Sequence, residues 1–297
     1  MIRPNKPTEL LRKVRCWLLD MDGTVTLGEE ALPGAAPFFR TIGRRQTDYI
    51  FLTNNSSHDA GHYVRRLNRI GIRAGRDQVL TSTDALALYL KSIAPAGRAP
   101  ILYPVGTPGF EHDLQAAGMV LEKQRGQAVD FVVLGFDTSL VYEKLDIACD
   151  YIRGGIPYLA ANPDRVCPLA GGKVLPDCGA LIAFMQTCTG KDPIRVIGKP
   201  DPAMIEMVIR SRGYARNELA MVGDRIYTDI ASAGNAGILG IAVLSGEATL
   251  EEIDASEVTP DFIFADIGEL AAVLDCVRDC VQDCVQDCVL DCVQDCE

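Results

Sequence analysis

The chain has 297 residues, of which 48% are hydrophobic and 23% are charged, and its net charge is −11. This composition is typical of a globular protein of about two domains, and no apolar run reaches the roughly 20 residues that span a membrane. The acidic balance argues against binding to nucleic acid, which requires a basic face. Segment 1–15 is polar and basic and does not resemble a secretory signal, so we expect a cytoplasmic protein without membrane contact.

The C-terminal segment 275–297 differs from the rest of the chain. It repeats Asp-Cys-Val-x almost six times, holds six of the 11 cysteines and carries −6 of the total charge of −11, which leaves −5 for the body. In a helix its aspartates would stack at i and i+4, a like-charge arrangement that destabilises helices. We predict a low-complexity tail without a catalytic role. The functional alternative is capture of a metal by its cysteine pairs.

The other cysteines are scattered along the body of the chain. They show no C-x-x-C spacing, and they are Cys16, Cys149, Cys167, Cys178 and Cys188. This pattern favours reduced, buried side chains over a disulfide framework or a zinc site.

From residue 17 the chain alternates between apolar runs and amphipathic segments. The predicted elements of this first stretch are a strand at 17–19, a helix at 34–45, a strand at 47–52 and a helix at 58–70. The first strand leads into Asp20 and Asp22, and the second leads into Thr53 and Asn54. This alternation predicts a parallel sheet with right-handed crossovers.

The middle of the chain has enough elements for a domain of its own. They are a helix at 84–93, a strand at 101–105, a helix at 109–117, a strand at 129–134, a helix at 142–152, a strand at 156–160 and a helix at 179–187. A loop rich in Gly and Pro at 167–176 precedes the last helix. We predict an inserted α/β domain at 82–192, between the two parts of a core at 1–81 and 193–274.

The third stretch resumes the first pattern. Its predicted elements are a strand at 194–197, a helix at 202–212, a strand at 219–222, a helix at 226–236, strands at 240–244 and 262–264, and a helix at 267–274. Lys199 follows the first of these strands, and Asp224 follows the second. The fold class is therefore predicted as α/β, with a doubly wound, Rossmann-like parallel sheet and a large inserted α/β domain.

Polar side chains follow four of the predicted strands. They are Asp20 with Asp22, Thr53 with Asn54, Lys199, and Asp224 with Asp229. Because ligands bind beyond the carboxyl ends of the strands in an open α/β sheet, we expect these groups to form one site. Carboxylates without a His or thiolate set favour Mg²⁺, which commonly bridges to a phosphate. Taken alone, Lys199 could be a solvated loop residue and Asp229 a helix cap.

The four segments D-M-D-G-T, T-N-N-S, G-K-P and G-D-R-x-x-x-D together resemble the four motifs of the haloacid dehalogenase superfamily. More narrowly, T-N-N-S after the second strand, an insert of about a hundred residues and G-K-P-D-P resemble subfamily IIA, the p-nitrophenylphosphatase-like group. That group includes nucleotide, phosphoglycolate and pyridoxal phosphate phosphatases. The resemblance covers roughly residues 14–274 and leaves the tail out.

The resemblance implies a phosphatase that hydrolyses small phosphomonoesters through an aspartyl-phosphate. Asp20 would be the nucleophile, and Asp22 would be the general acid that protonates the leaving oxygen and then the base that activates water. Thr53, with the backbone of Asn54, would hold the phosphoryl oxygens, and Lys199 would tie Asp20 to the phosphate.

The resemblance also implies a Mg²⁺ cofactor and a place for substrate recognition. The metal would be held by Asp20, the backbone carbonyl of Asp22 and Asp224, with support from Asp229. Within the loop 162–172 of the inserted domain, Arg165 would meet a second anionic group of the substrate, although a simple connector has the same composition.

Other functions remain open from the sequence. A phosphomutase shares the aspartyl-phosphate and differs mainly by excluding water from it, and a sensor would bind phosphometabolites without turning them over. In either case we expect a small phosphorylated metabolite as the partner, and neither nucleic acid nor a membrane. A homodimer through the inserted domain is a further expectation from the family.

Overall fold

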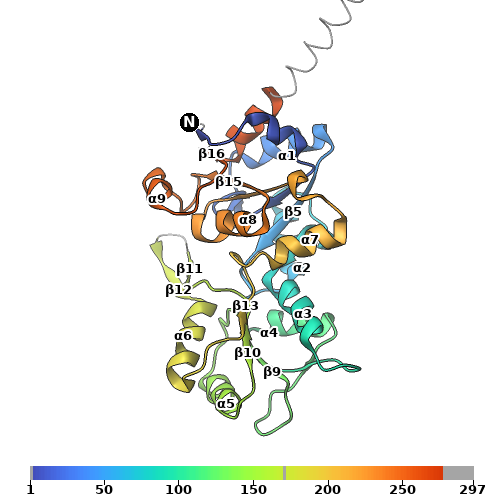
Figure 1. Ribbon diagram of the computed structural model, residues 1–297, viewed down its shortest axis with the longest axis vertical. Helices are drawn as coiled ribbons and strands as arrows, with labels where there is room; N and C mark the ends of the chain where they lie inside the picture. The colour runs from blue at the N-terminus through green and yellow to red at the C-terminus, as the bar shows by residue number, and fades with distance from the viewer. Residues whose placement is uncertain (1–2, 170–171, 277–297) are drawn as a thin grey trace, which may run out of the picture. The chain divides into compact units, whose positions relative to one another are not determined.

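The computed structural model describes residues 3–169 and 172–276 (Figure 1). The chain forms two compact units, of which the first runs to Tyr49 and resumes at Tyr214, and the second spans Ile50–Gly213. The domain boundaries expected from the sequence, after residues 81 and 192, stay a prediction. The repeat after residue 276 lies outside the described residues. No helix in the described part has both the length and the apolar character needed to cross a membrane.

The first unit is built on a mostly parallel sheet. Its strands lie in the order β1 (Arg3–Pro4), β16 (Phe262–Phe264), β15 (Leu239–Val243), β14 (Leu219–Gly223) and β2 (Cys16–Leu19). Only the short β1 runs antiparallel to its neighbour. Every residue of β2, β14, β15 and β16 is buried, as is usual for a parallel sheet covered on both faces. The expected doubly wound parallel core is confirmed.

Short helices and a hairpin complete this unit. They are η1 (Thr8–Lys13), the hairpin of β3 (Thr26–Leu27) and β4 (Glu30–Ala31), α1 (Ala35–Arg45), η4 (Arg216–Glu218), η5 (Ile226–Ile230), α8 (Ala231–Ala236), α9 (Leu250–Ala255) and a helix over residues 267–276. α1 contacts β2 through Phe38, whose ring meets Trp17 edge-on at a centroid distance of 5.7 Å. The Trp17 indole also donates to Thr47 Oγ1 at 3.0 Å, so its polar edge is satisfied.

The second unit contains a strand pair and a separate sheet. β5 (Asp48–Thr53) enters this unit from the first and pairs in parallel with β6 (Val79–Thr81). The separate sheet is parallel throughout, with its strands in the order β13 (Arg195–Val196), β10 (Tyr158–Ala160), β9 (Phe131–Leu134), β7 (Ile101–Val105) and β8 (Val120–Leu121). The helices of the second unit are α2 (Ala60–Arg69), η2 (Arg76–Gln78), α3 (Ser82–Ile93), α4 (Pro108–Ala116), α5 (Tyr142–Arg153), α6 (Cys178–Thr189) and α7 (Ala203–Arg212).

One expectation about local structure is wrong, and one expected helix differs in its type. The segment 167–176, expected to be a loop, contains most of an antiparallel hairpin of β11 (Val166–Pro168) and β12 (Val174–Pro176), in which Cys167 pairs with Leu175. Its Pro and Gly residues masked the strand pattern, although proline is tolerated at the exposed edge of a strand. The helix expected at 226–236 is present, but its first turn, η5, is π-helical, and α8 continues it.

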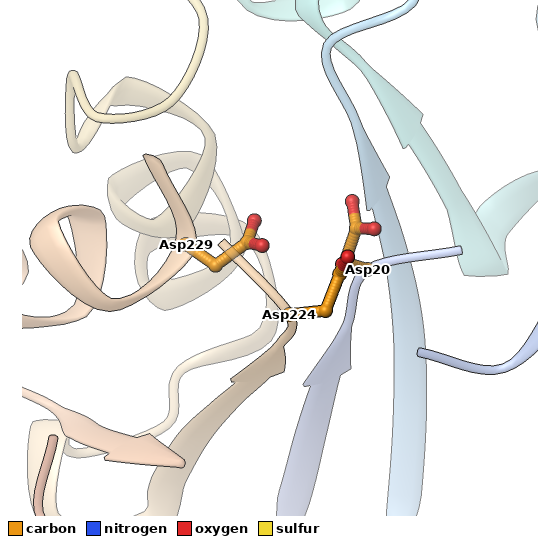
Figure 2. A group of neighbouring side chains, drawn as sticks. All are labelled: Asp20, Asp224 and Asp229. Atoms are coloured by element: carbon orange, nitrogen blue, oxygen red, sulfur yellow. The ribbon is translucent and has the colours of Figure 1, made fainter. Parts of the chain in front are cut away.

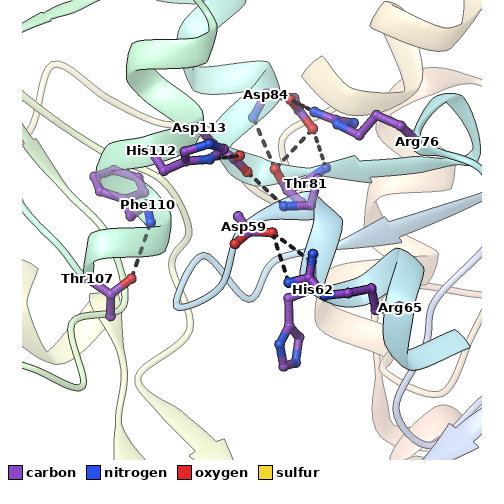
Figure 3. A network of polar contacts seen from close by, with 11 residues as sticks. Asp59, His62, Arg65, Arg76, Thr81, Asp84, Thr107, Phe110, His112 and Asp113 are labelled. Carbon is purple, nitrogen blue, oxygen red and sulfur yellow. Dashed lines mark hydrogen bonds and ion pairs between the residues drawn. The ribbon is translucent and has the colours of Figure 1, made fainter. Parts of the chain in front are cut away.

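Hydrogen bonds fix the segment that follows β5 within the second unit (Figure 3). Asp113 Oδ2 of α4 accepts from Ala60 N at 2.9 Å, at the first residue of α2. Thr107 Oγ1 donates to Ser57 O at 2.7 Å, and Ser56 Oγ accepts from Phe136 N at 2.9 Å. These bonds explain why residues 50–81 cluster with the chain that follows them.

Asp113 offers a test of this arrangement. Replacing Asp113 with Ala removes the acceptor of Ala60 N, and we expect the free energy of unfolding to fall by about 1–2 kcal/mol because a backbone donor loses its partner. Urea unfolding would measure the change. Asp113→Asn keeps an acceptor oxygen and should lose less, whereas equal losses in the two variants would mean that the hydrogen bond is not the source.

Candidate active site

Two neighbouring parallel strands bring two acids together in the first unit. Leu19 of β2 pairs with Val222 of β14, so both strands end at the same level of the sheet. Asp20 follows β2 directly, and its N–H donates to Val222 O at 2.9 Å. Asp224 follows β14 and is 3% exposed, whereas Asp20 is half-buried. The strand register alone therefore places these two carboxylates side by side.

The third acid comes from the π-helical turn η5 (Figure 2). Asp229 is fully buried, and its Oδ2 accepts from Arg225 N at 3.1 Å. Asp20, Asp224 and Asp229 each offer a carboxylate oxygen within 4.8 Å of the others. Extra residues in a helical turn often occur at functional sites, and here the widened turn directs Asp229 back toward the end of β14.

Two further groups hold Asp224 in place. Thr24 Oγ1 donates to Asp224 Oδ1 at 3.3 Å, and Glu247 N donates to Asp224 Oδ2 at 2.8 Å. Neither residue was assigned a role from the sequence. For Glu247 a sequence signal was present, because the polar residues Ser245 and Glu247 follow the apolar run of β15 and Leu244. Both bonds stabilise the ionised carboxylate, since an N–H or O–H donor favours the charged form.

Glycines leave the space that the carboxylates occupy. A Cβ added at Gly23 would lie 2.2 Å from Asp224 Oδ2, and one added at Gly246 would lie 2.0 Å from the same atom. A Cβ at Gly223 would lie 2.3 Å from Asp229 Cβ. Gly23 also has a φ of 90°, which side chains rarely adopt. The glycine of D-M-D-G-T is therefore required by both the backbone and the acid it faces.

A cation lies against this cluster. Arg225 Nε forms an ion pair with Glu247 Oε2 at 2.9 Å. Burial lowers the pKa of Arg225, but Asp20, Glu247 and Asp224 raise it more, and the net shift is upward. The guanidinium therefore stays charged and offsets part of the repulsion between the carboxylates. Sequence reasoning assigned this arginine no role.

The donor set fits a divalent cation. Within the described ranges, the three residues that could hold an ion together are all aspartates, so every side-chain ligand is an oxygen. Such a set suits Mg²⁺ or Ca²⁺, which prefer carboxylate and water oxygens. A bound cation would also offset the repulsion between the three carboxylates, since like charges at this distance oppose ionisation.

The Asp22 side chain has a different setting. It is exposed, and its Oδ1 accepts from Thr26 Oγ1 at 3.1 Å. It is not among the three carboxylates that lie together. An exposed carboxylate can exchange protons with solvent, which distinguishes it from the buried acids.

In the second unit, the segments T-N-N-S and G-K-P are bonded to each other. Lys199 N donates to Asn54 Oδ1 at 2.7 Å, and Asn54 Nδ2 donates to Lys199 O at 2.9 Å. Lys199 Nζ donates to Leu52 O at 3.1 Å, and the residue is 3% exposed. The alternative that Lys199 is a solvated loop residue is therefore wrong. Thr53 directly precedes Asn54, which forms these hydrogen bonds, and is also buried.

Arg165 lies at the base of the β11–β12 hairpin of the same unit. Its side chain is exposed, and its carbonyl accepts from Asp177 N at 3.0 Å. That bond fixes the backbone where the hairpin begins and leaves the guanidinium accessible to a ligand.

Comparison with known proteins identifies the family. A family model described as haloacid dehalogenase-like hydrolase matches residues 17–120, and one described as HAD-hydrolase-like matches residues 196–270. The acid sugar phosphatase of Staphylococcus saprophyticus is 34% identical over 265 residues, which cover 89% of this chain and 100% of that protein. The chain belongs to the haloacid dehalogenase superfamily of hydrolases. The resemblance expected from the four motifs is thus confirmed.

Solved structures place this hydrolase among the NagD and p-nitrophenylphosphatase-type enzymes of subfamily IIA. A 4-nitrophenylphosphatase from Thermotoga maritima is 40% identical and has a TM-score of 0.83. The match covers 89% of this chain and 98% of that protein's chain. A glycerol phosphate phosphatase from Mycobacterium tuberculosis, solved in complex with magnesium, is 30% identical with a TM-score of 0.81, and covers 88% of this chain and 78% of its own.

The glycines of the hydrolase's carboxylate cluster provide a test. In Gly246→Ala the new methyl group would meet Asp224 Oδ2, and we expect affinity for Mg²⁺ to fall at least about ten-fold because the ligand is displaced. Titration calorimetry would measure the affinity. Gly234→Ala is a matched control, because a Cβ there meets nothing within 4 Å. Unchanged affinity in Gly246→Ala would refute the assignment of Asp224 as a ligand.

Proposed function

We propose that this chain is a Mg²⁺-dependent phosphatase that hydrolyses small phosphomonoesters, with Asp20 as the nucleophile. The observation that carries the proposal is the group of three carboxylates, two after β2 and β14 and one from η5, whose oxygens lie within 4.8 Å of one another. Relatives named acid sugar phosphatase and 4-nitrophenylphosphatase support phosphate esters as the substrate class.

Asp20 and Asp22 have settings that suit two different tasks. Asp20 is half-buried and lies near the charge of Arg225, which offsets the repulsion from Asp224 and Asp229, and its carboxylate oxygen is the proposed attacking atom. The exposed Asp22, held through its Oδ1 by Thr26, donates a proton to the leaving oxygen and later takes one from the attacking water. The two steps replace one difficult displacement with two easier ones.

Mg²⁺, when bound, would be held by Asp20, Asp224 and Asp229 together with the backbone carbonyl of Asp22, and would neutralise charge on the phosphoryl oxygens. Thr24 and Glu247 orient Asp224 for this task, and Arg225 orients Asp229 through its backbone N–H. Such supporting bonds usually decide how tightly a metal ligand is positioned.

Thr53, Asn54 and Lys199 are proposed to bind the phosphoryl group. The reciprocal hydrogen bonds between Asn54 and the Lys199 backbone hold both segments in a defined arrangement. Burial removes water from the ammonium of Lys199, and a poorly hydrated ammonium interacts strongly with an anion. Lys199 would thus favour the phosphate in its bound position.

Hydrolysis of p-nitrophenyl phosphate is the direct test. Purified protein should release phosphate in the presence of Mg²⁺ at some value between about pH 5 and pH 9, and should stop when EDTA removes the metal. Asp20→Asn keeps the size of the side chain but removes the attacking oxygen's charge, so we expect kcat to fall about 10³-fold or more.

Two results would contradict this proposal. Absence of phosphate release over the whole pH range would exclude the phosphatase, and it would leave a phosphomutase or a sensor as the explanation for the site. Turnover retained in Asp20→Asn would overturn the nucleophile assignment. Circular dichroism of the variant should match the wild type, as a control for folding.

Arg165 is proposed to recognise the leaving group. Its exposed guanidinium can bind a second anionic group, so Arg165→Ala should raise KM about ten-fold or more for doubly anionic phosphometabolites and leave p-nitrophenyl phosphate nearly unchanged. A panel of phosphate esters would measure both effects. Arg165→Lys is the matched control for charge. An identical substrate profile in wild type and Arg165→Ala would remove this residue from the site.

A further inference from the structure

Two helices of the second unit bring a pair of cysteines together. α5 packs against α6, and Cys149 and Met185 belong to the buried cluster between them, with Cys188 packed against it. Cys149 Sγ lies 3.8 Å from Met185 Sδ. Met185 precedes Cys188 by about one turn of α6. Arg153, one turn after Cys149 on α5, donates to Cys188 O at 2.6 Å through Nη2. These two contacts place Cys188 opposite Cys149.

The electrostatic surroundings of Cys149 also include Cys188. Burial raises the pKa of the Cys149 thiol, and the influence of Cys188 raises it further. Residues three apart on a helix lie on the same face, so the contact with Met185 places Cys149 against the face of α6 that carries Cys188. The packing of α5 against α6 and the two flanking contacts therefore place the cysteines on facing sides of one helix–helix interface.

We propose that Cys149 and Cys188 form a reversible disulfide between α5 and α6 when the protein meets a low-molecular-weight disulfide. The pair would be a redox-sensitive site in the second unit. It does not depend on the phosphatase chemistry, because none of the catalytic residues takes part.

Burial decides the order of the two steps. Cys149 is 6% exposed and Cys188 is half-buried, so the reagent reaches Cys188 first. The Cys188 thiolate attacks one sulfur of the small disulfide, a mixed disulfide forms, and one small thiolate leaves. Cys149 then loses its proton to water and attacks the Cys188 sulfur, which releases the second small thiolate. In sum, two protein thiols are oxidised and one small disulfide is reduced to two thiols.

A second cysteine of α6 has different surroundings. Cys178, on the same helix, is fully buried, and its thiol donates to Leu134 O at 3.4 Å. Burial raises the pKa of Cys178 to about 12, so almost no thiolate is present at neutral pH. Cys178 is therefore an internal control for the specificity of the reaction.

The cross-link would stabilise the folded second unit. It closes a loop of about 40 residues, which restricts the unfolded chain. α6 begins next to Asp177, the residue whose N–H bonds to Arg165 O at the base of the β11–β12 hairpin. Joining α5 to α6 would therefore anchor the helix that supports this hairpin.

The test treats the full-length protein with oxidised glutathione or with dithiothreitol, blocks the remaining thiols with iodoacetamide, and digests it with trypsin. We expect a linked pair of peptides, 145–153 and 174–191, only after oxidation, and a rise in Tm of about 5 °C. The peptide 174–191 contains both Cys178 and Cys188, so variants must separate them. The tail cysteines lie in other peptides and do not interfere.

Three variants decide the outcome. Cys178→Ser should retain the linked peptides, whereas Cys188→Ser and Cys149→Ser should lose them together with the oxidation-dependent rise in Tm. All three should melt close to the wild type in dithiothreitol, which checks their folding, and Cys149→Ala serves if Cys149→Ser is unstable. Absence of the linked peptides in oxidised wild type, or their persistence in Cys188→Ser, would overturn the proposal.

Discussion

The structure depends on keeping three carboxylates close together in a partly buried place. Their oxygens lie within 4.8 Å of one another, and at that distance repulsion opposes ionisation of all three. The chain counters this repulsion with donors to Asp224 and with the charge of Arg225, and it makes room with glycines where a methyl group would collide. An arrangement that costs stability in this way is typical of a site prepared for a cation.

In the second unit, hydrogen bonds between two distant segments fix the position of Lys199. Asn54 and Lys199 lie 145 positions apart in the sequence, yet each bonds to the other through an amide and a backbone group. A Cβ at Gly198 would lie 2.6 Å from Asn54 Oδ1, so glycine is needed where these segments meet. Together these contacts hold a buried lysine in a fixed position, which a flexible side chain on the surface could not achieve.

Local patterns predicted some elements well and others poorly. The strands at 131–134 and 262–264 were recognisable because continuous apolar runs are typical of buried parallel strands. The β11–β12 hairpin was missed because its strands carry prolines and exposed residues, and its stability comes from pairing between the two strands. The π-helical turn at Ile226–Ile230 was missed for a related reason, since one extra residue in a turn leaves the apolar periodicity almost unchanged.

The sequence by itself determined the α/β class, the family and the acids at the strand ends, because strand periodicity and the four motifs are local properties of the chain. Tertiary structure alone decided which of those acids lie together and which groups hold them. Asp20, Asp224 and Asp229 form one cluster while the Asp22 side chain faces solvent, and Thr24, Glu247 and Arg225 support the cluster from other segments. These relations depend on strand register and on the widened turn after β14, and both are set by packing between segments that are distant in the sequence.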